Sequence, residues 1–119
     1  MRVALPTKDG QIFLQYDKAE EFTIYDVEIE LVQSKEIVPL GEISIADFLE
    51  TQQINVVICA DIRSAGKTLL RTKRIELTYG VTGNADDVMV RYLSGEALGT
   101  VEENAWLRME LDVRMKEEL

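Results

Sequence analysis

The fold is decided by residues 54–74, which read INVVICADIRSAGKTLLRTKR. The first seven of them are mostly apolar and rich in β-branched side chains, which predicts a strand buried on both faces. A polar turn at 61–64 follows, and then a segment of helix formers. A strand, a loop and a helix start in this order are the usual place for an anion site in an α/β protein, because free backbone N–H groups converge there.

The composition is that of one ordinary globular domain. The chain has 119 residues, 46% of them hydrophobic and 29% charged, which is enough for a single core. No apolar run is long enough to cross a membrane, and the first residues lack the hydrophobic segment of a signal peptide. The one cysteine excludes an intrachain disulfide. We therefore expect a cytoplasmic protein that does not bind membranes.

Charge is distributed unevenly along the chain. A formal net charge of −9 argues against a nucleic-acid partner, since that contact relies on neutralising phosphates. Between residues 62 and 75, however, there are no acidic residues and five basic ones, namely Arg63, Lys67, Arg71, Lys73 and Arg74. The first three are spaced four residues apart and would share one helix face. This cluster predicts either a patch for an anion or an acidic partner, or a solvated helix face.

The periodicity of apolar residues predicts a mixed sheet covered by helices. In the first half we expect strands at 2–6 and 11–15, a turn at 7–10, one helical turn at 16–21, and a hairpin of strands 22–29 and 30–38. In the second half we expect a helix at 45–52 capped by Ser44, the strand at 54–60 with its helix, a strand at 75–79, and a helix capped by Asn84 that ends at Gly95. The alternation in the second half predicts parallel strands joined by right-handed crossovers.

The carboxyl-terminal tail has the pattern of a strand. Its apolar residues Leu107, Met109, Leu111, Val113 and Met115 alternate strictly with charged ones, although many of these residues are good helix formers. A helix would spread the five apolar side chains over more than half of its circumference. The alternation therefore favours an extra strand, which would extend the sheet or pair with a second subunit in a homodimer.

Several short sequence blocks follow one another along residues 1–98. They are MRVALP with Thr7, FTIYDV at 22–27, IADFL at 45–49, VVIC at 56–59, GVTG at 80–83 and YLSG at 92–95. In this order they resemble the dinitrogenase iron–molybdenum cofactor biosynthesis family, a NifX/NafY-like domain. The resemblance implies a three-layer ribonuclease H-like fold without nuclease activity, with a mixed five-stranded sheet between helices. It also implies a small protein that binds or carries metal–sulfur cofactors, with residues 99–119 as an extension.

Two blocks depart from the family pattern. A His-Phe-Gly-Arg-Ala-like block is replaced by Gln15-Tyr16-Asp17-Lys18-Ala19, and the chain has no histidine at all. An imidazole ligand to a cluster is therefore excluded. Behind the central strand, a Gly-Gly-Ile-Gly-Pro-like loop is replaced by Ala60-Asp61-Ile62-Arg63-Ser64. Glycines that let a backbone approach a ligand closely have become larger residues.

The candidate cofactor-binding residues gather around the predicted carboxyl end of the central strand. They are Thr7, Gln15, Cys59, Asp61, Arg63 and Lys67. Cys59 is the candidate metal ligand if Arg63 and the helix start lower its pKa, and it is otherwise a small core hydrophobe. One thiolate is few for a metal–sulfur site, which normally has several.

Nothing in the sequence predicts an enzyme. Gly66-Lys67-Thr68 matches the end of a phosphate-binding loop, but Asp61 stands where the first glycine belongs and would repel phosphate. The carboxylates form no convincing metal pair, and a catalytic triad of the usual form needs histidine. We expect a binding protein for an anionic iron–molybdenum or other metal–sulfur cluster. The alternative is an interaction module that has lost the cluster, holds no cofactor and acts by self-association or partner docking.

Overall fold

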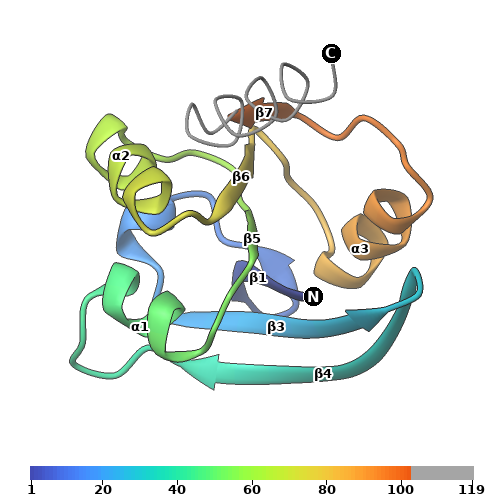
Figure 1. Ribbon diagram of the computed structural model, residues 1–119, viewed down its shortest axis with the longest axis horizontal. Helices are drawn as coiled ribbons and strands as arrows, with labels where there is room; N and C mark the ends of the chain where they lie inside the picture. The colour runs from blue at the N-terminus through green and yellow to red at the C-terminus, as the bar shows by residue number, and fades with distance from the viewer. Residues whose placement is uncertain (103–119) are drawn as a thin grey trace, which may run out of the picture.

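The computed structural model describes residues 1–102 of the chain, which form one mixed β-sheet with helices on both faces (Figure 1). The strands are β1 (Arg2–Lys8), β2 (Gln11–Ile12), β3 (Glu21–Glu28), β4 (Leu31–Pro39), β5 (Val56–Ile58), β6 (Glu76–Tyr79) and β7 (Thr100–Glu102). The helices are the 3-10 turn η1 (Tyr16–Lys18) and the α-helices α1 (Ile45–Thr51), α2 (Ser64–Thr72) and α3 (Ala85–Leu93).

The strand order gives the sheet two functionally different ends. It is β4-β3-β1-β5-β6-β7, with β2 pairing β1 outside this path. Strands β1, β5 and β6 run parallel, whereas β3, β4 and β7 are antiparallel to their neighbours. The carboxyl ends of the parallel strands therefore meet at one end of the sheet, here called the carboxyl end, opposite the amino end. Ligands of α/β sheets bind outside the carboxyl ends of strands where the chain order switches, and here it switches between β1 and β5.

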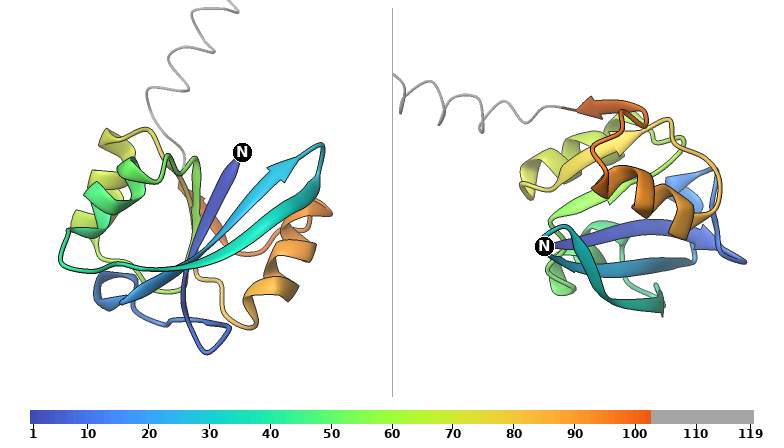
Figure 2. Two further views of the ribbon diagram at one scale, coloured as in Figure 1. Left: turned by 90° about the horizontal axis from the view of Figure 1, so that it is seen from below. Right: turned by 90° about the vertical axis from the view of Figure 1, so that its right-hand side faces the viewer.

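Two apolar layers hold the helices to the sheet. Helices α1 and α2 cover one face and α3 covers the other, as two perpendicular views show (Figure 2). Under α1 and α2, Phe22 stacks on Phe48 with ring centroids 5.4 Å apart, and Leu70 packs into the same cluster. Under α3, Val88 and Met89 pack against the other face of the strands. Each layer removes large apolar side chains from water, which is the main stabilising term.

The helix caps predicted for α1 and α3 are confirmed. The Ser44 hydroxyl accepts the N–H of Asp47 at 3.2 Å, and the Asn84 side chain accepts the N–H of Asp87 at 3.0 Å. Helix α2 begins differently, because its cap residue Arg63 makes no side-chain capping bond. The amino terminus of α2 therefore takes its partner from elsewhere in the chain.

Three sequence-based expectations about the sheet are wrong in detail. Within residues 1–102 the sheet has seven strands, whereas the family resemblance implied five, and the short strands β2 and β7 account for the difference. Strand β1 continues through Pro6 to Lys8, so the turn consists of Asp9 and Gly10, which have φ values of 53° and 78°. Pro6 is tolerated because its carbonyl still accepts the N–H of Phe13 at 2.8 Å. Strand β5 is shorter than predicted, since it covers only the apolar centre of 54–60.

Some predictions fall on residues that the structure does not describe. The strand expected at 107–115 lies there, as does most of the extension expected at 99–119. Strand β7, at the start of that extension, pairs with β6, so the boundary at residue 98 stays a prediction. Within residues 1–102, no helix is long and apolar enough to cross a membrane.

Candidate functional site

A strap of residues 9–20 crosses the carboxyl end of the sheet and is held there by its backbone. The N–H of Ile12 donates to the carbonyl of Gly83 at 2.8 Å, and the N–H of Ala85 donates to that of Gly10 at 2.9 Å. Asp61 is bonded from both sides, since its N–H donates to Leu14 and its carbonyl accepts the N–H of Tyr16, each at 3.0 Å. A ligand at the switch between β1 and β5 would therefore meet the outer surface of this strap.

Cys59 lies directly behind β5 as a buried thiol. It is fully inaccessible and belongs to the core cluster under α1 and α2. Burial raises the pKa of the Cys59 thiol from 9.0 to about 12, the carboxylates of Asp17 and Asp61 add to the rise, and Lys67 opposes it. The condition of a lowered pKa is therefore not met, and the burial of Cys59 agrees with the interpretation as a small core hydrophobe. The role of Cys59 as a metal ligand stays a prediction.

Asp17 of η1 supplies the partner that the start of α2 lacks. Its carboxylate accepts the N–H of Arg63 at 3.1 Å. Gly66, in the first turn of α2, allows this approach, because an added Cβ would lie 3.2 Å from the other Asp17 oxygen and 3.0 Å from the side chain of Ile62. A carboxylate at a helix amino terminus is favourable to the helix dipole. No local signal in the sequence indicates this role, because Asp17 lies 46 residues from Arg63 in the chain.

Four of the five basic residues between 62 and 75 fall into two groups. At the far end of α2, Arg71 pairs with Glu102 at 2.9 Å and Lys73 pairs with Glu50. Nearer the start, Lys67 lies 3.9 Å above the centre of the Tyr79 ring, a cation–π contact. No carboxylate within residues 1–102 forms an ion pair with Arg63 or Lys67.

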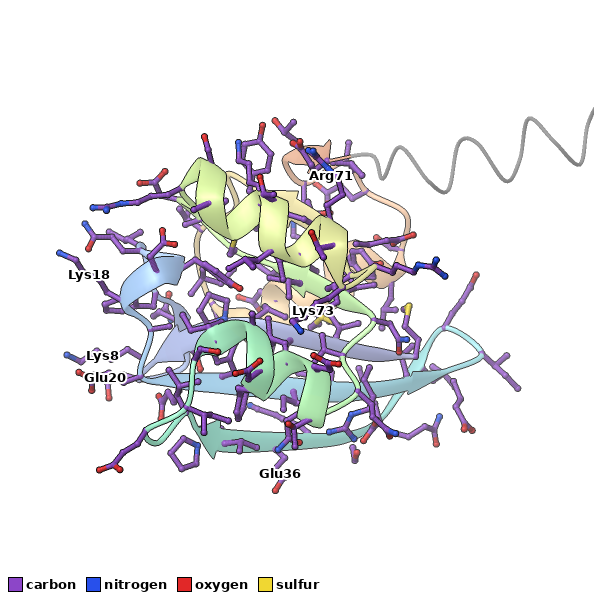
Figure 3. The ribbon with its side chains drawn as sticks, turned by 60° about the vertical axis from the view of Figure 1, so that its left-hand side comes forward. Lys8, Lys18, Glu20, Glu36, Arg71 and Lys73 are labelled. Atoms are coloured by element: carbon purple, nitrogen blue, oxygen red, sulfur yellow. The ribbon has the colours of Figure 1, made fainter. Side chains whose placement is uncertain are left out.

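Two further lysines project from the same end of the molecule. Lys8 ends β1 and Lys18 ends η1, and both point into solvent there (Figure 3). Neither forms an ion pair with a carboxylate of the described part of the chain. Together with Arg63, they make the carboxyl end a place where cations remain available. The sequence signalled Lys18 only through the altered block at 15–19.

The structure brings most of the predicted site residues together, but not all. The backbone of Gln15 forms an isolated β-bridge with that of Asp61. Lys67 and Asp61 are close enough to Cys59 to shift the pKa of its thiol. Thr7, by contrast, is buried and shares a 2.7 Å hydrogen bond with the hydroxyl of Thr23. Thr7 lines a separate cavity of about 370 Å³, together with Lys8, Phe13, Glu20, Glu21 and Pro39.

A second hollow lies between α1, α2 and η1. It measures about 580 Å³ and is lined largely by apolar side chains, including Leu40, Ile43 and Leu69, with Asp17 and Lys73 among its polar residues. Within residues 1–102, no three histidine, cysteine, aspartate or glutamate side chains group so as to hold a metal ion. The described residues around this end therefore offer charge, hydrogen bonding and apolar contact.

Comparison with known proteins gives a consistent result. The sequence profile of the dinitrogenase iron–molybdenum cofactor family matches residues 1–95. Among solved structures, PH0822 has a TM-score of 0.76 at 21% identity, over 88% of this chain and 96% of that one. A candidate dinitrogenase of Methanocaldococcus jannaschii has a TM-score of 0.73 at 21% identity, and the match covers 87% of this chain and 96% of that one. The apo form of the orange protein of Desulfovibrio gigas has a TM-score of 0.72 at 17% identity, and the match covers 86% of this chain and 96% of that one. No curated protein matches the chain.

Proposed function

Because the chain belongs to the dinitrogenase iron–molybdenum cofactor family, we propose that it binds an anionic metal–sulfur species as cargo at the carboxyl end of the sheet. It would hold and hand on this cargo without catalysing a reaction. The ribonuclease H-like classification belongs to the same proposal and is supported by the strand order β4-β3-β1-β5-β6 with its parallel centre. A cytoplasmic location of the protein is also part of this proposal.

The observation that carries this proposal is the division of the basic residues. The cations at the end of α2 are neutralised by Glu50 and Glu102. Arg63, Lys8 and Lys18 lie at the other end, where ligands of such sheets bind, and no described carboxylate pairs with them. In a chain of net charge −9, this is where an anion would be attracted most strongly.

The residues present fit an anion held by charge and hydrogen bonds. Guanidinium and ammonium groups donate strong charge-assisted hydrogen bonds, and sulfide-rich anions accept them. Coordination of a metal by Cys59 would in addition require that the loop at 59–64 open and that the thiol lose its proton, because Cys59 is buried with a raised pKa. We therefore assign the main share of binding to Arg63 and Lys67, with Gln15 beside them.

Anaerobic titration with tetrathiomolybdate, a dianionic metal–sulfur complex, tests the proposal. Visible absorption and gel filtration should show that the complex co-elutes with the protein in a fixed ratio. Arg63→Ala and Lys67→Ala should each weaken binding about tenfold, which corresponds to about 1.4 kcal/mol. The matched controls Arg71→Ala and Lys73→Ala remove cations that already have partners, so they should bind like the parent protein.

Three outcomes would count against this assignment. Absence of co-elution, or equal weakening by all four variants, would remove the carboxyl end as the binding place. Loss of binding in Cys59→Ser alone would instead make the buried thiol the ligand. Absence of co-elution would favour the alternative of an interaction module without cargo.

A further inference from the structure

The two outer strands of the sheet differ in how much edge they leave open. Within residues 1–102, β7 has three residues, whereas β4 has nine and pairs with β3 alone. Every residue of β4 from 31 to 37 is exposed. The exposed fraction is 54% for Ile37 and 65% for Leu31. An open strand edge presents unpaired backbone N–H and C=O groups to any extended chain that reaches it.

The usual devices that protect such an edge are weak in the second half of β4. Lys35 would be the natural deterrent, but its ammonium pairs with Asp86 of α3 at 2.9 Å. A bulge opposite Asp26 and Val27 interrupts the pairing near Gln33. Beyond it, the six residues from Ser34 to Pro39 pair with β3 without a break. This stretch is a regular, uncovered template for one more strand.

The open stretch leads directly to a cavity. Pro39 ends β4 and lines the cavity of about 370 Å³ described above, and its pairing partner Glu21 lines it too. Phe13 forms an apolar wall, while Glu20, Glu21 and Lys8 supply the charge. Two carboxylates against one ammonium leave this cavity with an excess of negative charge.

Apart from Lys8, the unpaired charges of this cavity and of the neighbouring stretch of β4 are acidic. Glu36 points from β4 into solvent, and Glu20 lies at the carboxyl end of the molecule (Figure 3). Among the described residues, no lysine or arginine forms an ion pair with Glu20, Glu21 or Glu36. A second copy of this acidic chain would meet charges of the same sign here. A basic segment would meet the opposite sign.

We propose that β4 binds an extended, basic segment of a partner protein, which adds a strand beside residues 34–39 and places a lysine or arginine side chain in the cavity of Glu20 and Glu21. The backbone edge supplies affinity, and the cavity supplies selectivity for a long cationic side chain whose stem contacts Phe13. Lys8 lines this cavity, whereas Arg63 and Lys67, to which the proposed function assigns the main share of cargo binding, do not. A protein that receives or delivers the cargo could therefore dock without displacing it.

The test uses an acetylated and amidated eight-residue peptide of alternating valine and arginine as the probe. Amide hydrogen exchange of the full chain should slow about tenfold or more within residues 34–38 when the peptide is added, and β7 should be unchanged. Replacing both Glu20 and Glu21 by glutamine should weaken peptide binding about tenfold. Glu76→Gln, at the amino end of β6, removes an exposed carboxylate elsewhere and should leave binding unchanged.

A peptide of the same pattern with glutamate in place of arginine is the matched control and should not bind. Equal binding of the two peptides would overturn the proposal, because charge would then play no part. So would protection confined to other strands, or no binding of the arginine peptide at millimolar concentration. Slow exchange within 34–38 in the protein alone, together with a dimer in sedimentation, would make a second copy the occupant.

Discussion

The amino and carboxyl ends of the sheet differ in how far side chains help to hold them together. At the amino end, side-chain contacts add to the backbone bonds: Arg2 donates to both oxygens of Asp26 at 3.1 Å and to the side-chain oxygen of Gln52 at 3.3 Å. Asn55 accepts the N–H of Arg2 at 2.8 Å. At the carboxyl end, backbone hydrogen bonds fasten the strap at 9–20 to the loops behind β5 and β6.

This difference supports the proposed place of binding. A side chain that is used to close the structure is not free to hold a ligand, whereas a backbone-bonded strap leaves its side chains available. The cations near the amino end, such as Arg2 and Lys73, have acidic partners. Those at the carboxyl end, such as Lys18 and Arg63, have none within residues 1–102. The following predictions run from the largest expected effect to the smallest.

The carboxyl end should lose stability in alkali through Cys59. The folded chain keeps the thiol proton up to about pH 12, whereas the unfolded chain loses it near the ordinary pKa of 9.0. Between these values the folded state binds more protons, so the free energy of unfolding falls as the pH rises. The full span corresponds to up to about 4 kcal/mol. Urea unfolding between pH 8 and 11 should show a steeper fall for the parent than for Cys59→Ala. Equal slopes would contradict this.

The amino end should depend on the Arg2 guanidinium. Arg2→Met keeps the aliphatic stem but leaves Asp26 and Gln52 without this partner. Because the pair is half-exposed, we expect a loss of about 1–2 kcal/mol in the free energy of unfolding. Lys35→Met breaks the more exposed pair with Asp86 and should cost less. If both variants lost the same stability, the amino end would have no special network.

The start of α2 should depend on Asp17. Asp17→Ala removes the side-chain acceptor of the Arg63 N–H. We therefore expect a loss of about 1 kcal/mol in the free energy of unfolding and faster amide exchange in the first turn of α2. Asp17→Asn retains an acceptor and serves as the control. Unchanged exchange in Asp17→Ala would mean that water caps this helix equally well.

The smallest effect should come from Lys67. Lys67→Met removes the cation above the Tyr79 ring and should cost about 0.5–1 kcal/mol in urea unfolding, while Lys67→Arg should retain most of it. A loss equal to that of Arg2→Met would show that the carboxyl end also relies on side-chain pairs.

Much of the fold was accessible to sequence reasoning because local signals agreed with it. The oxygen side chains of Ser44 and Asn84 marked the starts of α1 and α3, and the apolar centre of 54–60 marked the buried strand β5. The turn between β3 and β4 lies where the strands predicted at 22–29 and 30–38 meet, although the chain has no Asn-Gly pair there. Ile29 and Glu30 both adopt positive φ there, which the pairing of the two strands imposes.

The site was harder to predict because its properties arise from residues far apart in the chain. Cys59 was a candidate for a lowered pKa, yet burial among residues of several elements raises it. Thr7 was predicted to lie in one site with Asp61, but its hydroxyl shares a hydrogen bond with that of Thr23 and it lines another cavity. Neither the strap's bonds to Asp61 nor the capping of α2 by Asp17 has a local signal.

The sequence by itself determined the alternation of strands and helices, the family and the excess of basic residues at 63–74, because these depend on neighbours in the chain. Only the tertiary structure decided which of those cations stay available. Arg71 pairs with Glu102, which is 31 residues away in the chain, and Lys73 pairs with Glu50, which is 23 residues away, whereas Arg63 lies at the carboxyl end of the sheet. Ion pairing depends on distance in space, and that distance is set by how the sheet brings its elements together.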